Sequence, residues 1–158
     1  MKKLFNLPLI ILLLTACKDN IPTSMPDIGI VAELNQRIEL TTPEGWNSFI
    51  VGKPITIEIK NTSADSIMFD ANYGVRMFVY QTETWKEVSD GLTSYYNDSI
   101  VLKQYLGSAE DTGVISVLPK LENRSQKVLL RVFIIGVVIS NDNQVRKVGS
   151  YIDIYLRP

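Results

Sequence analysis

The sequence contains no histidine, and Cys17 is its only cysteine among 158 residues. A Ser-His-Asp triad, a Cys-His catalytic pair and an imidazole-ligated zinc site are therefore all excluded. A single cysteine also excludes a disulfide within the chain, so packing must stabilise the fold. We predict that the protein is not an enzyme and that it has no catalytic residue, no metal site and no cofactor.

The chain also lacks an excess of either charge and a long uninterrupted apolar segment after its first residues. Its 16 basic and 17 acidic residues give a formal net charge of -1. No basic patch favours binding to a phosphate backbone, so nucleic acid is not an expected partner. The apolar run Val128–Ile139 is interrupted by Arg131 and is shorter than the ~20 residues that a membrane-spanning helix needs. It predicts a buried strand.

The amino-terminal segment carries the most specific pattern in the chain. A basic start at Met1-Lys2-Lys3 precedes the apolar stretch Leu4–Leu14 and small residues before Cys17. This order is typical of a secretory signal peptide. The motif Leu14-Thr15-Ala16-Cys17 resembles a bacterial lipoprotein box, which implies cleavage before Cys17, a lipid on its sulfur and attachment to a membrane. The alternative is an ordinary signal peptide in which the cysteine is incidental.

This resemblance implies a location and a division of the chain. The residue after the cysteine is Lys18, not the Asp that marks inner-membrane retention in some enteric bacteria. In a cell with two membranes, the resemblance therefore favours the outer one. We predict an exported cell-envelope protein with a signal peptide over 1–16, the lipidated cysteine and a polar tether over 17–27, and one folded domain over 28–158.

The rest of the chain alternates between apolar and polar residues with period two. Ile55–Lys60 and Tyr151–Leu156 alternate in this way, as half-buried strands do. Turn-forming Gly, Pro, Asn and Asp separate these short segments. The pattern predicts an all-β fold, a β-sandwich of roughly seven to nine antiparallel strands.

Residues 49–88 carry a second resemblance. Phe49-Ile-Val-Gly52, Asn61-Thr-Ser63 and Ile67-Met-Phe69 follow one another as in strands B and C of bacterial immunoglobulin-like domains. Together with Phe78-Val-Tyr80 and Trp85, the segment is similar to a BsuPI-type proteinase-inhibitor domain. The resemblance implies an immunoglobulin-like sandwich and an inhibitory function.

Carboxylates are the remaining candidates for acid–base chemistry or cation binding. Glu110 and Asp111 are adjacent, so on an extended segment their side chains point apart. Asp70 is a candidate ion-pair partner of Arg76. Asn97-Asp98 and Asn141-Asp142-Asn143 offer oxygen atoms, but no run matches the twelve-residue calcium loop. We interpret these residues as parts of loops and turns. An enzyme that uses carboxylates alone is the least favoured alternative.

Aromatic residues and an apolar strand supply the candidate binding residues. Tyr95 and Tyr96 lie in a polar segment where at least one ring should be exposed, and such tyrosines are common in recognition loops. Trp46 belongs to the same aromatic-rich part of the chain. Val128–Ile139 is apolar on both faces around Arg131, so its second face needs cover, either from Ser99–Gly113 or from a partner.

These observations favour a non-catalytic protein-binding module that a lipid anchors at the cell envelope. The membrane through its lipid anchor and another envelope protein are the expected partners, and Tyr95, Tyr96, Trp46 and Arg131 are the candidate binding residues. The alternative is an inhibitor or immunity-type lipoprotein that blocks a protease or a toxin.

Overall fold

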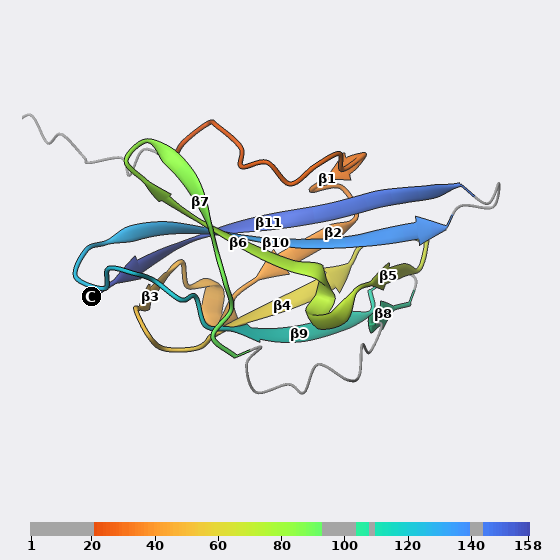
Figure 1. Ribbon diagram of the computed structural model, residues 1–158. Helices are drawn as coiled ribbons and strands as arrows, with labels where there is room; N and C mark the ends of the chain where they lie inside the picture. The colour runs from red at the N-terminus through yellow and green to blue at the C-terminus, as the bar shows by residue number, and fades with distance from the viewer. Residues whose placement is uncertain (1–20, 93–103, 108–109, 140–143) are drawn as a thin grey trace, which may run out of the picture.

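The computed structural model describes residues 21–92, 104–107, 110–139 and 144–158. The strands form two sheets that pack against each other, and two short 3-10 helices lie between strands (Figure 1). This arrangement confirms the predicted all-β sandwich. The described part of the chain contains eleven strands, more than the sequence suggested, because several are only two or three residues long. No helix within the described ranges is long and apolar enough to cross a membrane.

The strands divide unequally between the two sheets. The larger sheet contains β1 (Glu33–Leu34), β3 (Ser48–Ile50), β5 (Ile67–Phe69), β6 (Val75–Gln81), β7 (Thr84–Val88), β8 (Gln104–Leu106), β10 (Val128–Ile139) and β11 (Val145–Arg157). The smaller sheet contains β2 (Ile38–Thr41), β4 (Ile55–Asn61) and β9 (Thr112–Val117). The 3-10 helices are η1 (Pro43–Gly45) and η2 (Ala71–Gly74).

The long pair β10–β11 forms the centre of the larger sheet. The two strands are antiparallel, with Val128 opposite Leu156 and Ile139 opposite Val145. The other edge of β10 pairs first with β6 and then with β5, both antiparallel. The other edge of β11 pairs with β1 and β3, and both of these pairings are parallel. The sheet is therefore mixed rather than purely antiparallel.

The core lies between the two sheets and follows the alternation seen in the sequence. Ile55, Ile57 and Ile59 of β4 are fully buried, whereas Glu58 between them is exposed. Across the core, β10 contributes a row of buried side chains at its even-numbered positions. A period-two pattern thus places one apolar face of each strand in the interior.

The opposite, outer face of the larger sheet is also buried. Leu129, Arg131 and Phe133 of β10 are all shielded from solvent on this side. Phe78 and Tyr151 pack edge-on or tilted against Phe133 at centroid distances of 5.7 and 5.4 Å. Two layers of buried side chains on one strand explain why the sequence of β10 is apolar at nearly every position.

The expected cover from Ser99–Gly113 is wrong for the part of that segment that the structure describes. Its β8 joins the edge of the larger sheet by pairing with β5, and its last two residues begin β9 of the smaller sheet. The outer face is instead covered in part by residues 24–28, which we call the strap. The carbonyl of Ser24 accepts hydrogen bonds from Trp85 and Arg131, and Pro26 is buried. Part of the predicted tether therefore contacts the domain.

Candidate functional site

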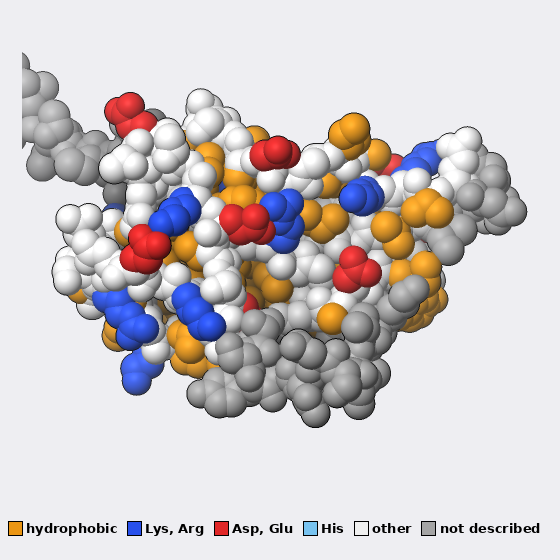
Figure 2. All heavy atoms as spheres, viewed as in Figure 1, with side chains coloured by type: hydrophobic (Ala, Val, Ile, Leu, Met, Phe, Trp, Pro, Cys, Tyr) orange, Lys and Arg blue, Asp and Glu red, His pale blue; other side chains and the backbone are white. Residues whose placement is uncertain are grey.

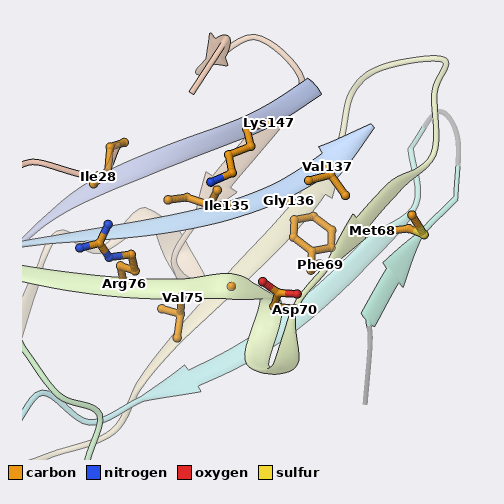
Figure 3. A pocket seen from close by; sticks show the side chains of 11 residues that line it. Ile28, Met68, Phe69, Asp70, Val75, Arg76, Ile135, Gly136, Val137 and Lys147 are labelled. Atoms are coloured by element: carbon orange, nitrogen blue, oxygen red, sulfur yellow. The ribbon is translucent and has the colours of Figure 1, made fainter. Parts of the chain in front are cut away.

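A hollow opens on the outer face where β10 changes its pairing partner. It measures about 350 Å³ and has an apolar floor that includes Ile28 of the strap and Ile135 and Val137 of β10. Figure 3 shows polar side chains on three sides of it, with Arg76 coming from β6, Lys147 from β11 and Asp70 from the segment before η2. The site thus combines an apolar base with a charged rim.

Two glycines allow the chain to make this opening. β10 pairs with β6 as far as Ile134 and with β5 from Gly136, and η2 connects these two strands. At Gly74 the backbone has a φ of +59°, and a Cβ atom there would lie 2.1 Å from the carbonyl oxygen of Ile135. At Gly136 a Cβ would lie 2.7 Å from the ring of Phe69. The tight turn and the strand switch both need the absence of a side chain.

The charges on the rim are not equivalent. Arg76 donates from Nε and Nη2 to the two carboxylate oxygens of Glu87 at 2.7 and 2.9 Å. The partner of Arg76 is therefore Glu87 and not Asp70, because the antiparallel pairing of β6 with β7 brings the two side chains to the same face. Asp70 and Lys147 are both exposed. One carboxylate lines the hollow, so no pair of acids converges there for hydrolysis.

The Arg76–Glu87 pair predicts a specific dependence of stability on pH. Hydrogen bonding to Arg76 lowers the pKa of Glu87 below its ordinary value of 4.5. The pair therefore contributes fully to stability above this value, and the contribution is lost as the pH falls through the lower pKa of the folded state. We expect Glu87→Gln to reduce the loss of thermal stability below about pH 4.5, measured by melting curves at a series of pH values. Glu83→Gln, which alters an exposed glutamate beside the same hairpin, should leave the slope unchanged.

Arg131, a predicted binding residue, is held inside the outer face. Its side chain is 2% exposed, and it donates from Nε and Nη2 to Asp153 at 2.7 and 2.8 Å. The guanidinium lies over the rings of Trp85 and Tyr151, 4.6 and 4.4 Å from their centroids. Its Nη1 donates to the carbonyl of Ser24 at 3.3 Å. Arg131 therefore links its own strand, β10, to β7, to β11 and to the strap. A partner would have to displace the strap to reach it.

Trp46 lies at the surface, as expected of a binding residue. It is 58% exposed and follows η1, beside Ile50, which is 59% exposed. A shallow hollow of about 670 Å³ joins these residues to Phe49, Lys53 and Arg157. Sequence reasoning missed Ile50, Lys53 and Arg157, because only the parallel pairing of β3 with β11 brings Ile50 opposite Arg157.

Several predicted features lie outside the described residues. These are the signal peptide, Cys17, the pair Tyr95 and Tyr96, and the two Asn-Asp segments at 97–98 and 141–143. All of them stay predictions.

The other carboxylates singled out in the sequence are held in local contacts. Glu110 pairs with Lys60, and Asp111 accepts hydrogen bonds from the backbone N–H groups of Gly107 and Thr112. Within the described ranges, no group of three or more acidic, cysteine or histidine side chains is placed to hold a metal ion.

Comparisons with known proteins add little to this geometry. No protein-family model and no curated protein matches the chain. Among solved structures, it is similar to Spo0M, a sporulation control protein from Bacillus subtilis, with 8% sequence identity and a TM-score of 0.37. The match covers 77% of this chain and 49% of that protein, so the chain spans about half the length of this neighbour.

Proposed function

We propose that the protein is an exported lipoprotein whose β-sandwich acts as a non-catalytic protein-binding module at the cell envelope. The observation that carries the proposal is the order of residues 1–17: basic start, apolar stretch, small residues and the chain's only cysteine. A lipid on that cysteine confines the domain to a membrane surface and raises its effective concentration for partners there.

The geometry of the site supports binding rather than catalysis. The hollow beside Gly136 offers an apolar floor and a rim with Lys147 and Asp70, which suits a short polypeptide segment with apolar and charged side chains. The carboxylates near it are single or held in ion pairs. We propose that the partner is another envelope protein, bound either through this face or through the segment containing Tyr95 and Tyr96.

The lipid anchor is tested by Cys17→Ser. Without the thiol no lipid can be attached, so we expect the protein to keep its leader and to lose the mass of the mature lipidated form. Intact-mass spectrometry and detergent phase separation of cell extracts measure both changes. Thr15→Ser, which keeps the cysteine and a small residue before it, is the matched control and should behave as the wild type. A wild-type protein cleaved to its mature length without lipid would contradict the proposal and favour the ordinary signal peptide.

An inhibitory role is the second candidate, and the resemblance of residues 49–88 to BsuPI-type inhibitor domains favours it. Crosslinking in intact cells with the anchored protein as bait, followed by mass spectrometry, distinguishes the two. One reproducible partner whose enzymatic or toxic activity falls at stoichiometric amounts of this protein supports inhibition. A partner whose activity is unchanged supports a binding module, and recovery of no specific protein contradicts both.

A further inference from the structure

One end of the sandwich carries exposed apolar and basic side chains together. We call Trp46, Phe49, Ile50, Lys53 and Arg157 the Trp46 surface. Trp46 and Ile50 are each more than half exposed, and none of the residues lining their hollow is acidic. Figure 2 shows Lys and Arg side chains beside hydrophobic ones at this end of the molecule, at the lower left.

Among the described side chains, the cations of this surface, Lys53 and Arg157, have no ion-pair partner. Arg124 adds a third cation, because its Nη1 lies 3.6 Å from where a Cβ of Gly52 would be. By contrast, Lys86 near the same end pairs with Glu122 at 2.8 Å. The surface therefore joins an exposed indole and an aliphatic side chain with unpaired cations.

The position of the surface matches the predicted anchor. Figure 1 shows that the described chain begins at the end of the sandwich that also holds β3 and the carboxyl end of β11. Cys17 lies four residues before Ile21, so even in a fully extended chain the two residues are at most about 14 Å apart. A lipid on Cys17 would hold this end of the domain close to the bilayer.

We propose that the Trp46 surface docks onto the anionic surface of the membrane that carries the lipid anchor. This inference rests on the proposed lipoprotein function. Tryptophan favours the membrane–water interface, and lysine and arginine are attracted to anionic headgroups. An aliphatic side chain such as Ile50 gains by leaving water for the acyl boundary. Docking orients the sandwich, so that the hollow near Gly136, away from this end, stays accessible to a partner.

The test uses the lipidated wild-type protein added to vesicles of phosphatidylethanolamine with or without phosphatidylglycerol. Lysine acylation followed by peptide mass spectrometry reports the accessibility of Lys53 relative to Lys147, which is exposed near the other end of β11. With phosphatidylglycerol we expect labelling of Lys53 to fall roughly five-fold and that of Lys147 to stay unchanged. The double variant Ile50→Ser, Arg157→Glu alters two exposed residues and should restore labelling of Lys53.

Two results would overturn the proposal. Equal labelling of Lys53 in both kinds of vesicle would show that the surface does not sense anionic lipid. Protection of Lys53 that persists in detergent would indicate a protein contact, such as a second copy of the chain. A failure of the anchor itself is recognised separately, because it changes the mass and the fractionation of the wild-type protein, whereas a wrong choice of surface changes neither.

Discussion

Arg131→Ala is expected to lower the free energy of unfolding by about 3–5 kcal/mol, which is a large part of the stability of a typical domain. The substitution leaves the Asp153 carboxylate, only 14% exposed, without its bidentate partner. It also removes the cation that lies over the rings of Trp85 and Tyr151. Removal of one member of a buried pair is costly because the other charge stays desolvated.

Urea denaturation followed by circular dichroism measures this loss. Arg76→Ala is the matched control, since it breaks an ion pair of similar geometry whose carboxylate is 50% exposed and should cost no more than about 1 kcal/mol. The double variant Arg131→Met, Asp153→Leu removes both charges and should recover most of the stability. Equal losses for Arg131→Ala and Arg76→Ala would show that burial on the outer face adds nothing to this ion pair.

Gly74→Ala is expected to destabilise the fold by about 3 kcal/mol or more. The left-handed backbone at this position alone disfavours alanine by about 1 kcal/mol. The larger contribution comes from the new Cβ, which would lie 2.1 Å from the carbonyl oxygen of Ile135. That oxygen belongs to the central strand, so either β10 or the turn at η2 must move.

Thermal melting of Gly74→Ala and Gly29→Ala separates the two contributions. Gly29 also has a positive φ, +75°, but no atom lies within 4 Å of where its Cβ would be. Gly29→Ala should therefore show only the backbone effect, about 1 kcal/mol. If the two variants melted at the same temperature, the close approach of η2 to β10 would not be a constraint on the fold.

The strands and their buried faces could be predicted from the sequence better than the pairing between strands. Alternation in Ile55–Lys60 and Tyr151–Leu156 correctly identified strands and their buried faces, because a strand with one buried face must repeat every two residues. The parallel pairing of β1 and β3 with β11 could not be predicted, since pairing between distant segments leaves no local pattern.

The contacts of Arg131 could not be predicted either, because they also come from segments that are distant in the sequence. The apolar pattern of β10 indicated that its second face needed cover, which is what the structure shows. The cover comes partly from Ser24 and Met25, in a segment whose polar, proline-containing sequence predicts no regular contact. The partner Asp153 becomes visible only once the register of β10 and β11 is known.

The parallel pairings of β11 also affect when the chain can fold. Glu33 lies opposite Val148 and Ser48 opposite Tyr155, so strands from the first third of the chain are completed by its last strand. Contacts between such distant residues form slowly, because a long loop must close before they contribute. A nascent chain cannot finish its larger sheet until its carboxyl end has been synthesised. Until then β1 and β3 lack the strand with which they pair.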